Sequence, residues 1–414
     1  MQKKLIALAI AGLSGAAFAQ TNVTIYGVAD ASFDAIRVSG GSAAGGTDAN
    51  TPNFTRVSTN GSYIGFKGTE NLGNGLNAVF QFESDAKFDN GGSLSTGRDS
   101  FVGLSGNFGK VLLGTLTAPT RALGARLDVN AGEGISSNTA ILGKLGGGLA
   151  YGGLQKSLIT RINVSSLSDL NISIASLSGG FNGLLRSNDS SSVFDSRHKN
   201  SIAYVSPSFS GFQASATYMA NENKSDFAGA GINTSAYDLG LTYDNGPIYI
   251  GGTYAELRVK NEAGNIVSAL LDPETKIKEA RLGGMYDFGV ATIRGLYART
   301  KLEGSGTDVK QNVWGLGGTY NVTPNGRITA QYYSANDLDG TVADDNTGAK
   351  FYTIGYEHSL SKRTMLKANY AYLKNDDMTS TNGGGGYDFG YNSSGFAGDE
   401  LKVSGLQLGL RHAF

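Results

Sequence analysis

The sequence predicts an all-β protein: a 16-stranded antiparallel transmembrane β-barrel with a constriction loop folded into the lumen. Three observations predict it: segments of about ten residues with alternating apolar and polar side chains recur along the chain, short turns alternate with long polar connections, and the N-terminus resembles an export signal. Alternation with a period of two places apolar and polar side chains on opposite faces of a strand. A membrane barrel turns the apolar face to lipid and the polar face to water, with short turns on the periplasmic side.

Composition excludes several classes of protein. The 414 residues include 61 Gly, 20 Tyr, 19 Phe and no Cys, and the formal net charge is −1. Without cysteine there is no disulfide, thiolate nucleophile or cysteine metal site. The charge excludes a strongly basic nucleic-acid binder. Beyond residue 20 no apolar run approaches the ~20 residues that a membrane helix needs, so a membrane role requires strands.

Residues 1–19 are predicted to be a cleavable signal peptide. Lys3 and Lys4 precede an apolar run from Leu5 to Leu13, and the small-residue motif that ends at Ala19 follows. This order of charged, apolar and small residues is typical of a secretory signal. Residues 20–414 would then form the barrel, as a multi-pass protein of the cell outer membrane.

The stretch 62–83 shows the repeating unit. Its apolar residues fall on one face and its polar residues, Lys67 and Glu83 among them, fall on the other. Residues 71–75, Asn-Leu-Gly-Asn-Gly, suit a tight reversal, because Gly and Asn tolerate a positive φ. The stretch is therefore predicted to be a β-hairpin.

The same pattern predicts the remaining strands, with 39–59 expected to be a loop. They are 21–37, 98–106, 110–117, 197–206, 211–220, 236–244, 247–257, 276–287, 290–300, 309–320, 327–333, 350–358, 364–374 and 401–414. With the two arms of 62–83 they make sixteen. An even number of strands can close into a barrel, which leaves no unpaired edge in lipid.

Residues 118–196 form an unusually long connection between the fifth and sixth predicted strands. Its first half contains the helix-compatible sequence TRALGARLDV and is expected to fold into the lumen. A structureless loop of this length would be uncommon in a compact domain. The second half is expected either to form an extra hairpin or to cover the extracellular mouth.

Several motifs resemble the general porins of β-proteobacteria, of the Burkholderia, Bordetella and Neisseria type. These are GFKGTENLGNGLNAVFQFE, RDSFVGLSGNFGKVLLG, RHKNSIAYVSPSFSGFQASATY, TYDNGPIY, GYEHSLSKRTMLKANYAY and the terminal GLQLGLRHAF. The resemblance implies a water-filled barrel that assembles as a homotrimer and is recognised by the outer-membrane assembly machinery through Phe414. Two arginines common in that family are replaced here by Tyr63 and Thr115.

The charges expected at the pore constriction lie on the strands and on the long loop. Lys67 and Glu83 point inward by parity, and Arg98, Lys110, Arg197 and Lys199 lie on neighbouring strands. The resemblance implies loop acids opposite a basic wall, with Asp128 and Glu133 as candidates beside Arg121, Arg126 and Lys144. This balance indicates a weak preference for anions, because charged rings at a narrow point set selectivity. A solvated position without a role remains the alternative for each charge.

No catalytic, metal or cofactor site is predicted. The three histidines, at 198, 358 and 412, do not converge, and the acids between 337 and 345 are interpreted as solvated loop residues rather than calcium ligands. The glycine runs lack the Lys-Ser/Thr of a phosphate-binding loop.

The predicted function is passive diffusion of small hydrophilic solutes and ions across the outer membrane. The expected partners are outer-membrane lipid, lipopolysaccharide and further copies of the chain. The alternative is an adhesin or surface antigen with the same fold, whose pore is plugged by residues 118–196.

Overall fold

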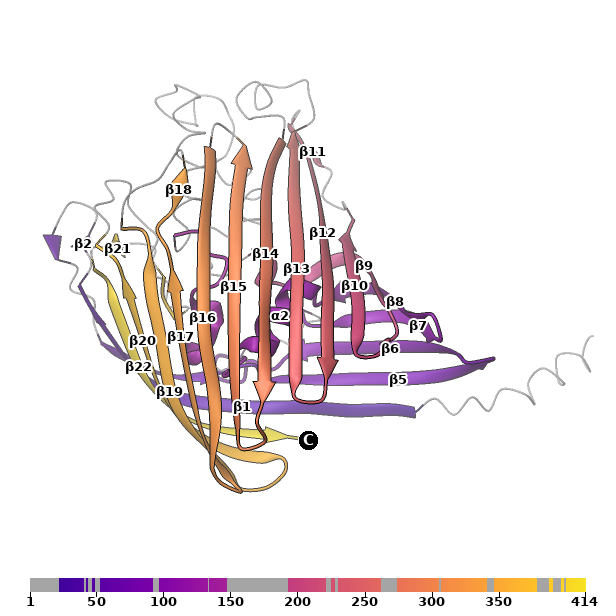
Figure 1. Cartoon of the computed structure of the whole chain (residues 1–414), viewed down its shortest axis with the longest axis horizontal. Coiled ribbons are helices and arrows are strands. Elements are labelled where there is room, and N and C mark those ends of the chain that lie inside the picture. Colours follow the sequence, from indigo (N-terminus) through magenta and orange to yellow (C-terminus); the bar gives the residue numbers. More distant parts are fainter. Residues whose placement is uncertain are drawn as a thin grey trace, which may run out of the picture.

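The computed structural model describes residues 22–40, 42–43, 47–48, 53–91, 97–132, 134–146, 193–220, 225–227, 230–261, 274–304, 307–340, 346–377, 387–389, 396–397 and 400–414. The predicted signal peptide lies outside these ranges, as does most of the second half of the long connection. Within them the chain forms one antiparallel sheet that closes on itself (Figure 1). No helix in the described part of the chain is long and apolar enough to cross a membrane.

The described segments of the sheet make sixteen barrel strands, as predicted. They are β1 (Asn22–Ser39), β4 (Phe54–Thr59) with β5 (Tyr63–Gly73), β6 (Leu76–Asp85), β7 (Ser100–Gly106), β8 (Gly109–Leu116), β9 (His198–Val205), β10 (Phe212–Met219) with β11 (Ser225–Phe227), β12 (Ala230–Asn245), β13 (Ile248–Asn261), β14 (Glu274–Asp287), β15 (Ala291–Gly304), β16 (Thr307–Thr323), β17 (Gly326–Ala335) with β18 (Asp339–Gly340), β19 (Ala349–Ser359), β20 (Thr364–Asn375) and β22 (Lys402–Ala413). The first and last strands pair from Val28↔Ala413 to Ser39↔Lys402, which closes the barrel. A separate small sheet contains β2 (Ser42–Ala43), β3 (Thr47–Asp48) and β21 (Phe396–Ala397).

The C-terminus lies at the end of the barrel where short turns join β12 to β13, β14 to β15 and β19 to β20 (Figure 1). The turn after β5 uses Gly73, Asn74 and Gly75, all with positive φ, as the Gly/Asn pattern predicted. By the usual asymmetry of such barrels, the end with short turns is periplasmic.

The predicted loop 39–59 is wrong in its second part, because residues 54–59 form β4. This segment pairs with β1 from Ala31↔Thr59 to Ile36↔Phe54 and lies in line with β5. Arg56 in this segment points inward and pairs with Asp34. The alternation of side chains in 54–59 was not recognised because polar residues surround the segment in the sequence.

The outward face carries large apolar side chains, as predicted. Leu282 and Leu316 are 61% and 56% exposed, whereas Leu257 and Leu302, at inward positions of the same part of the wall, are 2% and 0% exposed. In a soluble protein the burial would be reversed. The wall therefore presents its apolar residues to lipid.

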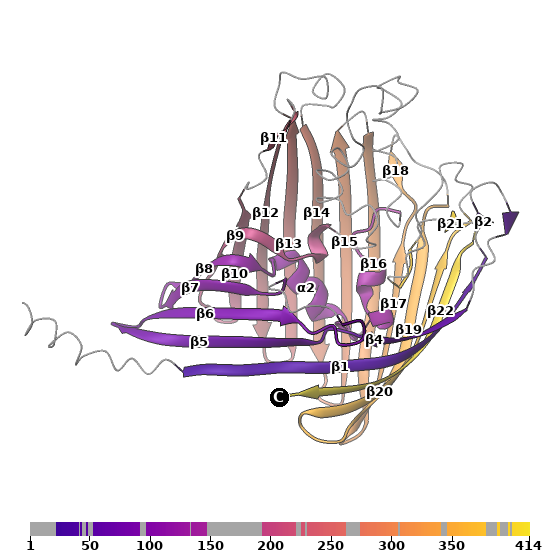
Figure 2. The ribbon, with the colours of Figure 1, turned by 180° about the vertical axis from the view of Figure 1, so that it is seen from behind.

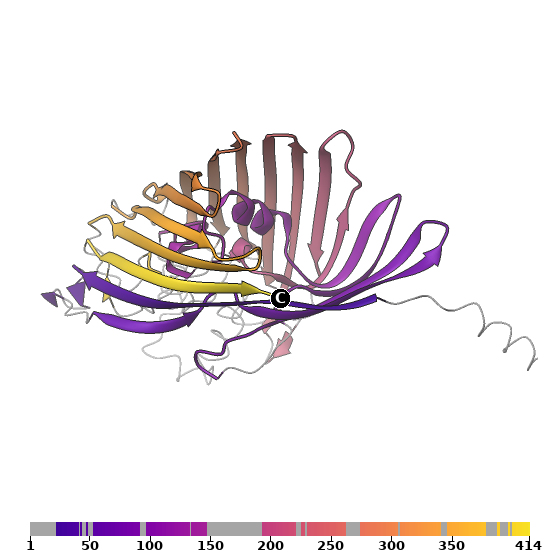
Figure 3. The ribbon, with the colours of Figure 1, turned by 90° about the horizontal axis from the view of Figure 1, so that it is seen from below.

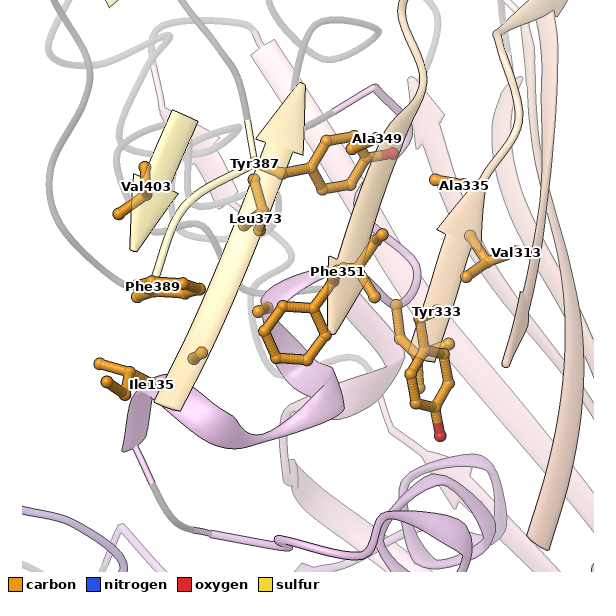
Figure 4. Packing of buried hydrophobic residues seen from close by; sticks show 14 of the residues in the cluster. Ile135, Val313, Tyr333, Ala335, Ala349, Phe351, Leu373, Tyr387, Phe389 and Val403 are labelled. Atoms are coloured by element: carbon orange, nitrogen blue, oxygen red, sulfur yellow. The ribbon is translucent and has the colours of Figure 1, made fainter. Parts of the chain in front are cut away.

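The inward face is less uniformly polar than the alternation suggested. Residues of the long connection pack against apolar side chains of the upper inner wall, among them Tyr333, Phe351 and Leu373 (Figure 4). Tyr387 and Phe389, from the connection between β20 and β22, join the same cluster. The barrel thus holds a dry core inside its wall, because the inserted segment must bury apolar surface to stay in place.

Candidate functional site: the lumen and its inserted segment

The inserted segment begins with α2 (Pro119–Leu127), followed by η1 (Gly134–Ser136) and η2 (Asn138–Ala140). The view from below shows α2 inside the ring of strands (Figure 3), and the view from behind shows it between β5–β8 and the tall strands β12–β16 (Figure 2). The prediction that the first half of the connection enters the lumen agrees with this placement.

The N-terminus of α2 is capped by the wall rather than by its own sequence. The Thr120 backbone N–H lies 3.0 Å from a carboxylate oxygen of Asp238 on β12, and the Thr120 hydroxyl donates to the same carboxylate at 2.8 Å. Ala118, the residue at the cap position, makes no side-chain bond. The negative charge of Asp238 also suits the positive end of the helix dipole.

Arg281 on β14 binds both ends of the long connection 118–196. Its guanidinium group binds Asp195 with two bonds, of 2.8 and 2.6 Å, and donates to the Thr120 carbonyl at 3.1 Å. Its Nε pairs with Glu279 on the same strand, and the Arg281 and Glu279 side chains are fully buried. Bidentate pairing of this kind is geometrically specific. Arg281 therefore joins the start of the long connection, at Thr120, to its end, at Asp195.

Glycines in the wall make room for the segment. A Cβ at Gly251 would lie 2.6 Å from Leu123, and one at Gly283 would lie 2.4 Å from Leu127. Gly124 on the helix lies against Arg281, whose Nη1 would be 2.3 Å from an added Cβ. A side chain at any of these positions would have to push Leu123, Leu127 or Arg281 aside, so part of the high glycine content serves the close approach of helix and wall.

Asp128 lies inside the inserted segment, where it is 2% exposed. Its carboxylate accepts hydrogen bonds from the Ser137 hydroxyl at 2.7 Å and from the backbone N–H groups of Asn138 and Asn130 at 2.9 and 3.0 Å. Burial raises the pKa of Asp128, against these bonds, which lower it. The residue thus holds the segment together and does not face open lumen. Glu133, the other expected loop acid, lies outside the described residues.

Lys67, Glu83 and Arg98 come together on the inner wall. Arg98 pairs with Glu83 at 3.3 Å and with Asp85 at 3.1 Å, and its guanidinium lies 4.5 Å from the centre of the Tyr63 ring. Lys67 lies over the Tyr26 ring at 4.6 Å. Arg98 thus supplies a positive charge beside Tyr63.

α2 carries two arginines, the partly buried Arg121 and the exposed Arg126. Arg126 is half exposed, 3.5 Å from Asp244, and lies over the Tyr249 ring. Burial and the neighbouring charge of Arg197 lower the pKa of Arg121. Arg197 in turn binds Asp99 at 2.9 Å, and Asp99 also accepts from the Thr117 backbone at 2.6 Å. Arginine keeps its proton in such surroundings, so these groups remain cations.

The structure does not place every expected constriction residue near α2. Lys110 lies beside the short turn after β7, far along the strand from the inserted segment, and the side chain of Lys199 is exposed on β9. Sequence reasoning missed Asp99, Asp195, Asp238, Arg281 and Arg294. The strand parity that placed Lys67 inward also places Arg281 inward, and that signal could have found it.

Some charges near α2 are paired and others are not. Glu83 and Asp85 share Arg98, Asp195 and Glu279 share Arg281, and Asp99 binds Arg197. Lys67, Arg121 and Arg294, by contrast, have no carboxylate within ion-pair distance among the described residues, although Arg294 donates to the Asp128 carbonyl at 2.8 Å. No described carboxylate lies in ion-pair contact with these three cations.

The described residues contain no group of three or more histidine, aspartate or glutamate side chains placed to hold a metal ion. Asp337 accepts from the Gly348 backbone at 2.8 Å, and Asp339 pairs with Lys310. Both acids thus have protein partners.

A closed barrel with an apolar outside, a charged lumen and an inserted segment defines a transmembrane channel of the outer-membrane type. The chain matches the sequence model of the Gram-negative porins over residues 5–378. It is 30% identical to outer membrane porin protein 32 of Delftia acidovorans, with both chains covered completely. The chain belongs to the Gram-negative porin family.

Solved structures agree with the family. The fold matches that of an anion-selective porin from Comamonas acidovorans with a TM-score of 0.68 and 28% identity, over 95% of this chain and all of the other. It also matches the trimer form of OmpT, an outer membrane protein of Vibrio cholerae, with a TM-score of 0.58 and 15% identity, over 95% and 99% of the two chains. The protein is thus an outer-membrane diffusion channel, and porins are channels rather than enzymes.

Proposed function

We propose that this porin passes small hydrophilic solutes and ions with a preference for anions, through a lumen narrowed by the segment from Pro119 to Gly146. The observation that carries the proposal is a set of lumen cations with no carboxylate within ion-pair distance in the described part of the chain, Lys67, Arg121 and Arg294. Low-dielectric walls focus the field of such charges on the path of an ion.

The narrowing is supported by the number of wall strands that the segment touches. Its backbone and side chains bond to Asp238 on β12, Arg281 on β14, Gln331 on β17, Thr353 on β19 and Gln407 on β22. A segment attached at so many points occupies part of the lumen cross-section. It leaves the half-exposed Arg126, and Arg121 five residues before it, beside the remaining passage.

Liposome swelling tests the proposal. Vesicles that contain the purified porin are placed in solutions of a neutral sugar, an anionic sugar acid or a cationic amino sugar of similar size. We expect the sugar acid to enter faster than the amino sugar, with the neutral sugar between them. Equal rates for both charged solutes would contradict the preference, and exclusion of all three would contradict an open lumen.

We propose a homotrimer as the assembled state, each copy having its own pore. The trimer form of the structurally similar Vibrio protein supports this proposal at the level of the fold. Planar-bilayer recording should show conductance steps in groups of three, and native mass spectrometry should give three times the mass of one chain. A monomer that conducts in single steps would contradict the trimer.

Phe414 is proposed as the residue recognised during outer-membrane assembly. It is 48% exposed at the end with short turns, and its backbone pairs with Gly27 at 3.1 and 3.2 Å. An exposed terminal ring on a strand that closes the barrel is available to a partner before closure. Contact of the outer wall with outer-membrane lipid and lipopolysaccharide is proposed on the same basis of exposed apolar residues.

A further inference from the structure

Two tyrosine rings meet on the wall of the barrel near Lys67. Tyr26 on β1 and Tyr63 on β5 have their ring centres 6.0 Å apart and their planes at 73°, which is an edge-to-face contact. We call these two rings the tyrosine pair. β1 and β5 are direct neighbours in the wall, and Tyr26 lies opposite Gly65 (Figure 2). The tyrosine pair therefore bridges two adjacent strands.

The tyrosine pair faces the lumen. On the same two strands Ile25 and Phe66 are 60% and 42% exposed and belong to the outward face of the wall. Because side chains alternate along a strand, Tyr26 and Tyr63 point to the opposite face. Both tyrosines are half-buried, so part of each side chain remains accessible from the lumen.

Tyr26 is held firmly in its place. A Cβ at Gly65 would lie 2.6 Å from Cζ of Tyr26, so the ring lies against the backbone of β5. The Tyr26 hydroxyl donates to Glu83 on β6 at 2.8 Å. The carboxylate of Glu83 also accepts from Gln81 at 3.1 Å and from Arg98 at 3.3 Å. A ring that is fixed in this way loses little conformational freedom when a solute binds to it.

The two cations beside the tyrosine pair differ in their partners. Arg98 lies 4.5 Å from the centre of one ring and binds the carboxylates of Glu83 and Asp85. The Lys67 ammonium lies 4.6 Å from the centre of the other ring. Lys67 is exposed and has no carboxylate within ion-pair distance in the described part of the chain. It is therefore the cation that can bind the carboxylate of a solute.

The cation and the rings follow one another along β5. Lys67 and Tyr63 are four residues apart on the same face, which corresponds to about 13 Å along a strand. The Tyr26 ring lies against Gly65, between these two positions. Asp85 lies opposite Tyr63, at the end that is remote from Lys67. The charges thus favour one orientation of a solute, with its carboxylate at Lys67 and its ring beside the tyrosines.

We propose that the tyrosine pair and Lys67 form a lumen subsite for aromatic carboxylates. The inference rests on the proposed preference for anions and names a class of anion that this side of the lumen favours. Aromatic rings attract one another in edge-to-face and offset arrangements, beyond the gain from burial alone. An aliphatic acid lacks that attraction, a neutral aromatic solute lacks the ion pair, and an aromatic amine is repelled by Lys67.

The test measures the concentration of a solute that halves the chloride current through the purified full-length porin in a planar bilayer. The probes are benzoate, cyclohexanecarboxylate and benzyl alcohol. Cyclohexanecarboxylate has the charge and nearly the size of benzoate without an aromatic ring, whereas benzyl alcohol has the ring without the charge. Comparison of the two acids therefore isolates the contribution of the rings.

Three variants separate the parts of the subsite. Y63L removes one ring of the tyrosine pair, Y63F keeps the ring without its hydroxyl group, and K67Q removes the charge. The matched controls are Y320L, which removes a tyrosine that is 52% exposed on the outer wall, and K362Q, which removes an exposed cation from the turn between β19 and β20.

In the unmodified porin we expect benzoate to halve the current at a concentration about fivefold lower than cyclohexanecarboxylate does, since an aromatic pair contributes about that factor. Y63L should abolish the difference between the acids, whereas Y63F and Y320L should keep it. K67Q should raise the half-blocking concentration of both acids about fivefold, which is the upper range for an exposed ion pair. Benzyl alcohol should act equally on K67Q and the unmodified porin, and K362Q should behave like the unmodified porin.

Equal half-blocking concentrations of the two acids in the unmodified porin, or a difference that persists in Y63L, would overturn the proposal. A loss of the difference in Y63F would also overturn it, because the hydroxyl group rather than the ring would then be responsible. K67Q with an unchanged response to both acids would exclude the ion pair and with it the subsite. The two acids carry the same charge, so their difference does not depend on the ion preference of the pore. A reversal potential without chloride preference on the same preparations would count against the proposed ion preference instead.

Discussion

Removing the Arg281 side chain should loosen the inserted segment without opening the barrel. In the variant R281M the carboxylates of Asp195 and Glu279 stay where they are, 7% and 0% exposed, and lose their cation. Breaking a buried ion pair by removal of one partner typically costs about 3–5 kcal/mol. The Thr120 carbonyl also loses its bond to the guanidinium. Even the lower figure multiplies the undocked fraction of the segment by roughly 100.

Single-channel recording measures the effect. We expect larger open-channel current noise and brief excursions to higher conductance, because the segment leaves the lumen part of the time. The unfolding temperature in detergent should change little, since the interstrand ladder of the wall is intact. The triple variant R281Q/D195N/E279Q keeps similar volumes without an uncompensated charge, so its noise should return close to that of the unmodified protein.

Current noise and conductance in R281M equal to those of the unmodified protein would refute this reasoning. They would show that the segment does not depend on the buried pair.

Four further outcomes are expected. The variant R121Q should lower the ratio of anion to cation permeability about fivefold. A unit charge about 8 Å from an ion in water contributes ~0.5 kcal/mol, with opposite signs for an anion and a cation. Reversal potentials measure the permeability ratio, and an unchanged ratio would contradict the role of Arg121. The variant D128N should leave that ratio unchanged. Burial raises the pKa of Asp128 in the docked segment, so docking weakens as the pH rises from the usual carboxyl range through that raised pKa. Current noise should therefore grow with pH in the unmodified protein, and it should grow less in D128N. The variants G251V and G283V should each displace α2 and raise the conductance, and channels with unchanged conductance would show that the close contacts with Leu123 and Leu127 are not needed. Deletion of Phe414 should reduce the amount of barrel in the outer membrane of living cells while protein refolded in detergent still conducts; normal amounts in cells would contradict the role in assembly.

The strand pattern was predictable because lipid and water impose it directly on the sequence. Alternation along 62–83 predicted an outward Phe66 and inward Lys67 and Glu83, and in the structure Phe66 is 42% exposed and Glu83 is 8% exposed. The same rule failed at residues 54–59, where polar residues occupy positions of both parities. Alternation identifies a strand only where one side is consistently apolar.

The interior of the lumen was predictable only in outline. The sequence indicated a helix near residue 121, but its cap at Asp238 lies 118 positions further along the chain, and Arg281 and Asp195 are separated by 86. Such pairs meet only after the barrel has closed, so spacing along the sequence carries no sign of them. The sequence showed a high glycine content, but only the structure shows that Gly251 and Gly283 lie directly against α2. Asp128, expected at the pore constriction, proved to be an internal bond acceptor of the inserted segment.

The most direct measurement is the reversal potential of the unmodified porin across a tenfold KCl gradient in a planar bilayer. A perfectly selective channel would approach about 59 mV in either direction. If Lys67, Arg121 and Arg294 carry uncompensated charge beside the permeation path, the potential has the sign of chloride preference and shrinks as salt rises, because the charges become screened. A potential of the opposite sign would contradict the anion preference proposed for these three cations.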